Sequence, residues 1–217
     1  MGARSPSALA LLLALALAAA AAGGEVQHTV DTNDSESCDD ADAAVCEQDV
    51  HIIQAKWAAA IKRISATHKE GGDFVQAAAD AAGELYAYGH SEVLFKPTKA
   101  AEHQFRPTPE SAMSYFVGGA NVEEGGLSED GGFAINGGRG WLECVFDNHN
   151  IVIKNGIGLA MGNYYFTCAT TGHRITVEYT FGYERCADGV VRIFLHHSSV
   201  PFDQAAAATA EQAKEEL

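Results

Sequence analysis

The sequence predicts an α+β domain in which the helices come first and an antiparallel sheet follows them. Two patterns carry this prediction. Between Val50 and Tyr88, apolar residues recur every three or four positions, which is the spacing of amphipathic helices. Between Trp141 and Val200, segments rich in strand-forming residues are separated by short turn signals. Such short loops join antiparallel neighbours, so we expect the helices to cover one face of the sheet.

Two helices and a short third one are expected before the sheet. The first ends at the glycines 71–72, and the second, which is rich in Ala on its packing face, ends at Gly89. The segment 91–98 is expected to be extended, because Pro97 lacks an amide proton and disfavours helix at the residue before it. The third helix is expected to begin at 108–109, where Thr can cap the helix and Pro can occupy its first position.

Four strands are expected, and the alternation of the last two indicates which side chains face the helices. The odd positions of 175–183 are apolar and the even ones are mostly polar, so the odd row should face inward. In the last strand the odd row that begins at Val191 is the more apolar one, and it continues as His197 and Ser199. Two polar residues at the end of an apolar inner row predict a pocket there. The strands lie near 141–147, 159–168, 174–185 and 190–200.

The charge of the chain excludes two classes of partner. Its 217 residues carry 14 Lys and Arg against 29 Asp and Glu, a net charge of −15 at neutral pH. Nucleic acids and anionic membrane surfaces bind through clustered Lys and Arg, so neither is expected as a partner. The content of apolar residues, 47%, is ordinary for a globular protein.

Four parts are expected along the chain: a signal peptide at 1–24, an acidic linker at 25–47, the folded domain at 48–202 and a tail at 203–217. The apolar run at the N-terminus is too short and too rich in Ala for a membrane anchor, which is the alternative. The last four residues, KEEL, resemble a signal for retention in the endoplasmic reticulum. The expected location is the secretory pathway, in the endoplasmic reticulum lumen or outside the cell, with the lumen of a complex plastid as an alternative.

Five cysteines are present, which leaves at least one thiol unpaired. Cys38 and Cys46 lie in an acidic segment where a disulfide could close a local loop. The other three, Cys144, Cys168 and Cys186, fall in strand-like sequence and are expected to be small buried side chains. The sequence contains no Cys-x-x-Cys motif and no Cys/His spacing typical of zinc sites, so a structural metal site is not expected.

Five segments, taken in order and together, carry a resemblance to a known family. They are LFKPTKA at 94–100, SYFVG at 114–118, MGNYYF at 161–166, VEYTFGY at 177–183 and LHHSS at 195–199. They resemble segments of the iota-class carbonic anhydrases of algae and bacteria. The resemblance covers roughly 48–202 and, more distantly, extends to the association domain of calmodulin-dependent kinase II and the nuclear-transport-factor-2-like superfamily. It implies a cone-shaped fold, in which a strongly curved antiparallel sheet wraps the helices around a pocket.

The resemblance also implies an activity, the reversible hydration of carbon dioxide to bicarbonate. Carried over residue by residue, it places the catalytic groups at Thr98, Tyr115, His197 and Ser199. The three hydroxyls are expected to bind the substrate and the reacting water, while His197 moves the proton. The alternative is a non-catalytic module of the same fold, which binds a small anion or forms oligomers.

Aromatic side chains are expected to wall the pocket and contact the substrate. Tyr165 and Phe181 carry this expectation, and packing in the core is the alternative for both of them.

A metal-free site is favoured, with no residue assigned as a metal ligand and with Mn or Zn as the alternative cofactor. Adjacent side chains on a strand point to opposite faces, so His196 and His197 cannot both bind one ion without distortion. Some members of the family carry a third His before this pair, where the present chain has Leu195.

A homodimer is expected as well. It would form through the outward row of the last strand, which is taken to hold Arg192, Phe194 and His196.

Overall fold

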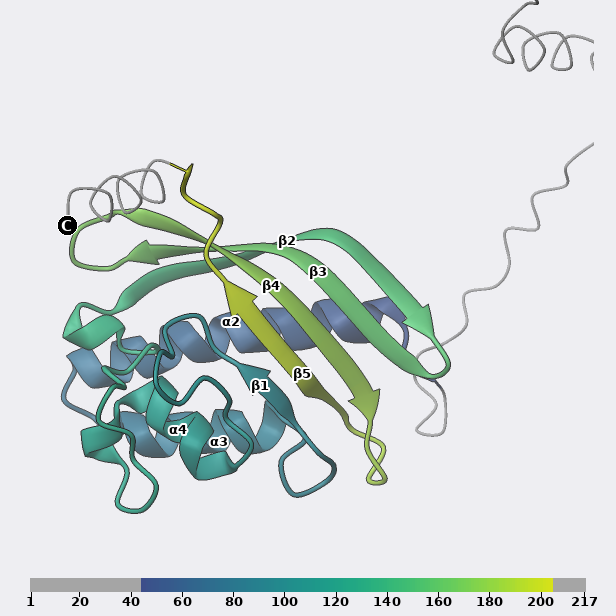
Figure 1. Ribbon diagram of the computed structural model, residues 1–217, viewed down its shortest axis with the longest axis horizontal. Coiled ribbons are helices and arrows are strands. Elements are labelled where there is room, and N and C mark those ends of the chain that lie inside the picture. The colour runs from purple at the N-terminus through teal and green to yellow at the C-terminus, as the bar shows by residue number, and fades with distance from the viewer. Residues whose placement is uncertain (1–43, 205–217) are drawn as a thin grey trace, which may run out of the picture. The chain divides into compact units, whose positions relative to one another are not determined.

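The computed structural model describes residues 44–204, in which two α-helices come before the first strand, a third follows it, and the other four strands come last (Figure 1). The predicted α+β class is confirmed. The helices are α2 (Glu47–Lys69), α3 (Phe74–Leu85) and α4 (Pro109–Val117), with two short 3-10 helices, η1 (Gly119–Asn121) and η2 (Asn136–Gly138). The strands are β1 (Leu94–Lys96), β2 (Trp141–Lys154), β3 (Ile157–Cys168), β4 (Arg174–Arg185) and β5 (Val191–Ser199).

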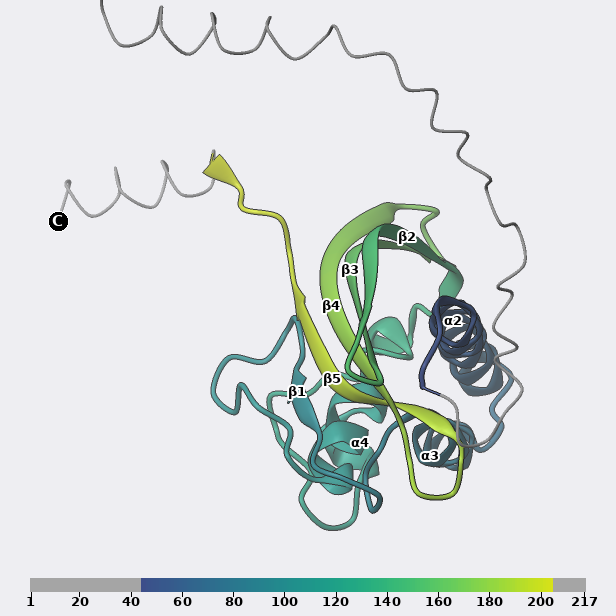
Figure 2. The same ribbon diagram turned by 90° about the vertical axis from the view of Figure 1, so that its right-hand side faces the viewer.

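The five strands form one sheet in the order β1-β5-β4-β3-β2. The neighbouring strands β5 and β4, β4 and β3, and β3 and β2 are antiparallel, as predicted. Strand β1, in contrast, pairs with β5 in parallel. Figure 2 shows that the sheet is strongly curved and that α2 lies on its concave side. The parallel pair places the chain that leaves β1 beside the end of β5.

Helix α2 supplies the centre of the core. Its predicted apolar stripe, which runs from Val50 to Ile64, is buried. Trp57 lies in the middle of the stripe, and its ring is within 6.2 Å of the rings of Phe146, Tyr164, Phe166 and Phe181, measured between centroids. These aromatic contacts join three strands to one helix.

The predicted inner row of β4 is confirmed, because Val177, Tyr179, Phe181 and Tyr183 are all buried. The prediction for β5 is wrong beyond Ile193. Gly182 pairs with Leu195, but the next residue, Tyr183, pairs with Ile193, so that Phe194 is an extra residue in β5. Such a bulge reverses the alternation of side chains that follows it.

After the bulge the even positions of β5 face the core. His196 and Ser198 are buried, whereas His197 is exposed and Ser199 is partly exposed. The row predicted to form the homodimer surface is therefore not exposed as expected, because His196 turns inward after the bulge and Arg192, which precedes the bulge, is buried as well.

The buried cysteines are as predicted. Cys144, Cys168 and Cys186 have free, buried thiols. Cys46 is disulfide-bonded, and its predicted partner Cys38 lies outside the described residues, as do the predicted signal peptide and most of the tail. Within 44–204 no helix is both long enough and apolar enough to cross a membrane.

The bulge in β5 depends on Gly182. A Cβ atom at this position would lie 2.8 Å from the ring of Phe194 and 2.9 Å from Cβ of Leu195, which is closer than packed carbon atoms approach. We expect Gly182→Ala to destabilise the protein by about 1–3 kcal/mol, as overpacked substitutions do. Urea denaturation followed by circular dichroism measures this change.

Gly83→Ala is the matched control, since no atom lies within 4 Å of a Cβ at this exposed position of α3. It should raise stability by about 0.5–1 kcal/mol, because Ala favours helix over Gly. Equal denaturation midpoints for wild type and Gly182→Ala would contradict the role of the close contact.

Candidate active site

Two inward side chains at the end of β5, His196 and Ser198, meet the chain that leaves β1. Strand β1 runs parallel to β5 and places Phe95 opposite His196. Pro97 follows the strand, and the next residue, Thr98, turns its hydroxyl toward β5. Thr98 Oγ1 lies 2.9 Å from Ser198 Oγ. The hydroxyl of Thr98 is thus brought to Ser198, and not to the predicted Ser199.

Two tyrosines complete a group of four hydroxyls, which we call the hydroxyl cluster: Thr98, Tyr115, Tyr164 and Ser198. Tyr115 comes from α4, and its phenol lies next to the hydroxyl of Thr98 and the backbone of Lys99. Tyr164 comes from β3, and its phenol lies next to the hydroxyls of Ser198 and Thr98. Burial raises the pKa of both tyrosines above the ordinary value of 10. Both phenols are therefore neutral near pH 7 and can donate hydrogen bonds.

His196 connects the hydroxyl cluster to the core. Its Nε2 lies 3.4 Å from Tyr164 Oη, and its Nδ1 lies 2.7 Å from Tyr86 Oη. Trp57 Nε1 in turn donates to Tyr86 Oη at 2.9 Å. In a neutral imidazole one nitrogen donates and the other accepts, so His196 can pass a proton between the two tyrosine hydroxyls. A chain of hydrogen bonds runs from the core to the hydroxyl cluster.

The surroundings of His196 keep its ring uncharged. The ring stacks on Phe95 with centroids 4.5 Å apart, and it lies 4.1 Å from the ring of Phe181. Burial lowers the pKa of His196 well below 6.5, and the charge of neighbouring His197 lowers it further. His196 is therefore a neutral acceptor or donor at neutral pH.

A cavity of about 200 Å³ adjoins the hydroxyl cluster at Tyr115. Its apolar wall includes Phe133, whose ring stacks on Tyr115 with centroids 5.4 Å apart, and Trp141. Its charged side chains include Lys99 and Arg139. A small apolar molecule can contact the aromatic wall while its polar atoms face hydroxyls and cations.

Two acidic residues also line the cavity, and both are already paired. Asp130 binds the fully buried Arg106 at 2.8 Å and accepts a hydrogen bond from Ser114 Oγ at 2.6 Å. The carboxylate of Glu129 accepts hydrogen bonds from three successive backbone amides, at 101–103, which lower its pKa to about 2. These pairs hold the loop that follows Thr98 against the cavity.

Two of the predicted catalytic residues lie apart from the hydroxyl cluster. His197 is exposed on the outer face of the sheet, and Ser199 donates to Glu178 Oε2 at 2.8 Å on that same face. The bulge at Phe194 is the physical reason, because beyond it the inward and outward rows of side chains on β5 are exchanged. Thr98 and Tyr115 do lie together, as predicted.

Of the two aromatic residues predicted to contact substrate, the structure places one inside and one outside. Phe181 is fully buried against His196. Tyr165 lies on the outer face, where the guanidinium of Arg174 covers its ring at 4.1 Å. Its neighbour Tyr164 takes the inner position.

Sequence reasoning missed Tyr86 and Tyr164. Both rows of β3 contain large apolar residues, so alternation could not tell which of the adjacent tyrosines, Tyr164 or Tyr165, faces inward. Tyr86 follows the end of α3, where the helical pattern stops and no strand pattern begins.

Comparisons with known proteins agree with this geometry. Residues 48–200 match the family described as metal-independent carbonic anhydrase. The chain belongs to this family. It is 34% identical over 167 residues to a metal-independent carbonic anhydrase from Nostoc sp., an alignment that covers 74% of this chain and 76% of that protein.

A solved structure gives the same result. The crystal structure of an iota-carbonic anhydrase from a cyanobacterium, complexed with bicarbonate, matches with a TM-score of 0.67 and 32% identity, over 74% of this chain and 95% of that one. A nuclear transport factor 2-like protein from Salmonella enterica matches with a TM-score of 0.37 and 11% identity, over 71% of this chain and 95% of that one.

The family relationship bears on the cofactor as well. A family of metal-independent enzymes agrees with the metal-free site that the sequence favours. The donor set of the site points the same way, since the hydroxyl cluster and His196 supply one imidazole, four hydroxyls and no carboxylate. Catalytic zinc sites in proteins use three ligands drawn from His, Cys and carboxylates.

The buried imidazole generates a prediction about stability. Below about pH 6.5 the unfolded chain protonates His196 while the native protein does not, so the unfolded state binds more protons and stability falls as the pH falls. We expect this loss to begin near pH 6.5 and to continue as the pH falls toward the lowered pKa of His196, with a slope of up to about 1.4 kcal/mol per pH unit. Denaturant unfolding at a series of pH values measures the slope.

His196→Phe should remove this part of the pH dependence, although it lowers stability at every pH. His197→Gln changes an exposed side chain and keeps His196, so it serves as the control that retains the slope. A slope in His196→Phe equal to that of the wild type would contradict the assignment.

Proposed function

We propose that this chain catalyses the reversible hydration of carbon dioxide to bicarbonate at the hydroxyl cluster, without a metal ion. The observation that carries the proposal is the convergence of four hydroxyls and one neutral, buried imidazole beside a cavity, in a chain of the metal-independent carbonic anhydrase family. A structure of that family, 32% identical to this chain, contains bicarbonate.

The geometry accounts for the chemistry as follows. A water molecule bound by Ser198 and Thr98 attacks the carbon of carbon dioxide, and the bond from water oxygen to carbon forms as the water loses a proton. The proton passes through Tyr164 to Nε2 of His196, in the tautomer whose Nδ1 proton is donated to Tyr86. Hydroxyl donors, Tyr115 among them, stabilise the negative charge that develops on the carbon dioxide oxygens.

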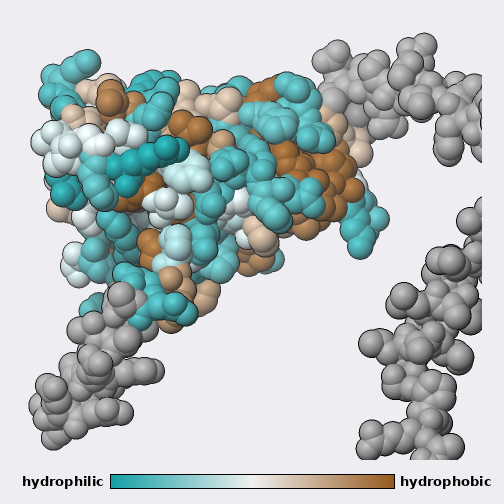
Figure 3. Space-filling view, turned by 90° about the horizontal axis from the view of Figure 1, so that it is seen from above, coloured by the Kyte–Doolittle hydropathy of each residue, from teal (hydrophilic) through white to brown (hydrophobic). Residues whose placement is uncertain are grey.

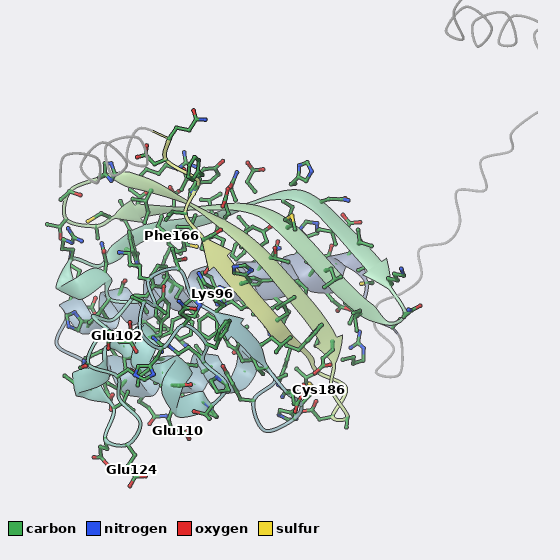
Figure 4. The ribbon with its side chains drawn as sticks, viewed as in Figure 1. Lys96, Glu102, Glu110, Glu124, Phe166 and Cys186 are labelled. Carbon is green, nitrogen blue, oxygen red and sulfur yellow. The ribbon has the colours of Figure 1, made fainter. Side chains whose placement is uncertain are left out.

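Local charge favours the anionic product. Lys99, which follows Thr98, lines the cavity together with Arg139, whereas Lys96 (Figure 4) extends from the outward row of β1 beside His197. The acids nearby are paired with Arg106 or with backbone amides. Bicarbonate therefore meets two cations at the site although the whole chain carries a net charge of −15.

The test of the site compares two adjacent serines. We expect Ser198→Ala to lower kcat for carbon dioxide hydration by about 10- to 1000-fold, because it removes one hydrogen-bonding group from the reacting water. Ser199→Ala, its matched control on the outer face, should leave kcat within about twofold of the wild type. Tyr115→Phe should behave like Ser198→Ala. Stopped-flow hydration assays measure these rates.

The same assay tests whether hydration needs a metal ion and whether His196 acts as the base. Activity should survive exhaustive chelation, and its rate should rise with pH through a midpoint below 6.5, because burial lowers the pKa of His196 and the base must be deprotonated. Bicarbonate binding without any turnover would favour the alternative, a non-catalytic anion-binding module. Loss of activity in Ser199→Ala but not in Ser198→Ala would contradict the proposed site and favour a catalytic site on the outer face of the sheet.

A homodimer is the oligomeric state that we propose, and the outer face of the sheet is its contact surface. Figure 3 shows hydrophobic and hydrophilic residues interspersed on this side, as in many interfaces. Met161 is 54% exposed there, and it lies beside His149, Thr180 and His197 around a shallow depression. Light scattering should give twice the chain mass at micromolar concentration, and Met161→Lys should shift the protein toward monomer.

The location that we propose is the secretory pathway, with cleavage of the signal peptide near Gly24. The support is the short apolar run at the N-terminus and the KEEL tail. Intact-mass measurement of the protein made in a secretory host should give a chain that begins near residue 24 or 25. Retention of Met1 would contradict cleavage.

A further inference from the structure

A second group of reactive side chains lies at the opposite end of β5 from the hydroxyl cluster. His90 follows α3, while Cys186 and Asp188 belong to the turn between β4 and β5. One ligand atom from each, a ring nitrogen, a thiol sulfur and a carboxylate oxygen, lies within 4.8 Å of the other two. Figure 4 shows Cys186 at this turn. We call these three residues the turn cluster.

The turn cluster is separate from the catalytic groups. Along β5, Val191 follows the turn and His196 lies five residues further on, which is roughly 15 Å of strand. None of the three side chains contacts the hydroxyl cluster through a hydrogen bond that the structure records among the described residues. A ligand at the turn cluster would leave the reacting groups unobstructed.

The carboxylate of Asp188 is charged and has one oxygen available. Its Oδ1 accepts hydrogen bonds from Arg192 Nη1 at 2.8 Å and from the backbone amide of Val190 at 3.1 Å. Its Oδ2 faces His90 Nδ1 at 3.9 Å. The hydrogen bond from Arg192 is the largest cause that lowers the pKa of Asp188, to about 2. Metal-binding carboxylates are commonly held in this way, with the second oxygen hydrogen-bonded to the protein.

The backbone holds the two parts of the turn cluster in place. Cys186 and Val190 close the turn with a hydrogen bond from the Cys186 amide to the Val190 oxygen at 2.9 Å. The other part is fixed by the hydrogen bond from the amide of His90 to the oxygen of Ala87, and the amide of Ala87 bonds to Ile193 of β5. A hydrogen bond between Ser91 and Glu184 joins the two segments again.

The combination of ligands identifies the ion. We propose that His90, Cys186 and Asp188 bind one Zn²⁺ ion, with a water molecule as the fourth ligand. Zinc takes thiolate, imidazole and carboxylate ligands in tetrahedral geometry, with bonds of about 2.0–2.3 Å that place neighbouring ligand atoms about 3.4–3.6 Å apart. The spacing in the turn cluster, up to 4.8 Å, needs a contraction of only about 1 Å. Harder cations such as Mg²⁺ and Ca²⁺ prefer oxygen ligands alone.

Arg192 opposes the bound cation and also orders its ligands. Its side chain hydrogen-bonds to Asp188 and lies beside Cys186. Zinc binding converts the Cys186 thiol to a thiolate, so two anionic ligands then offset part of the positive charge of Arg192 and the ion. Since this step releases a proton, zinc affinity should rise with pH.

Zinc at this position would join the segment that leads into β1 to the strand that carries His196 and Ser198. The expected consequence is greater stability of the folded protein, since an ion that binds only the native state stabilises it by mass action. Hydration activity should not depend on the ion, in agreement with a metal-independent family.

The experiment uses the full chain, stripped of metal and with the disulfide of Cys46 intact, and titrates it with Zn²⁺ and with Co²⁺ as a spectroscopic substitute. We expect one Zn²⁺ per chain by equilibrium dialysis, a rise of roughly 5–10 °C in Tm at zinc about 100-fold above Kd, and sulfur-to-cobalt charge-transfer absorption. Cys186→Ser should abolish the charge-transfer band, and His90→Ala should weaken zinc binding at least tenfold. Cys168→Ser and His103→Ala are the matched controls that keep wild-type binding.

His90 is exposed, so His90→Ala tests the site even if Cys186→Ser fails to fold. A charge-transfer band that persists in Cys186→Ser, or zinc binding that is unchanged in His90→Ala, would overturn the proposal, as would absence of zinc binding to the wild type. The outcome is independent of the proposed function, because both variants should retain wild-type hydration rates whether or not zinc binds.

Discussion

The contact between Gly182 and Phe194 is the constraint on which the arrangement of the site depends. Because Gly182 has no side chain, the ring of Phe194 can lie against the backbone of β4, and β5 accommodates one extra residue there. The bulge reverses the alternation of β5, so that His196 and Ser198 turn toward Tyr164 and Thr98. Without it, the regular alternation would direct His197 and Ser199 inward and leave the hydroxyl of Thr98 without its partner on β5.

The parallel pairing of β1 with β5 is the second requirement. It brings the segment that follows Pro97 to the end of β5, although about 100 residues separate Thr98 from Ser198 in the chain. The loop after Thr98 contains few apolar anchors and is held instead by Glu129 and by the pair of Arg106 with Asp130. Loss of one member of such a buried pair leaves an uncompensated charge, which costs several kcal/mol. The position of Thr98 therefore rests on electrostatic interactions as well as on packing.

Burial determines what His196 can do. Trp57, Phe95 and Phe181 surround its ring, so protonation of the imidazole is energetically unfavourable. Both of its nitrogens nevertheless have tyrosine hydroxyls as hydrogen-bond partners. A buried polar group that is fully hydrogen-bonded can be kept in one orientation, whereas an unpaired one is costly. The same packing that stabilises the core thus produces a proton acceptor whose pKa lies below that of an exposed imidazole. Stability and the proposed chemistry share one set of contacts.

The sequence by itself determined the class of the fold, the burial of the α2 stripe, the inner row of β4 and the presence of Thr98 and Tyr115 at the site. The first three features follow from local periodicity, which a linear chain displays directly, whereas Thr98 and Tyr115 were implied by the resemblance to a known family. Tertiary structure alone decided which of His196 or His197, of Ser198 or Ser199, and of Tyr164 or Tyr165 faces inward. The physical reason is that a bulge arises from contacts between neighbouring strands, here Gly182 against Phe194, and one extra residue is enough to exchange the two faces of a strand.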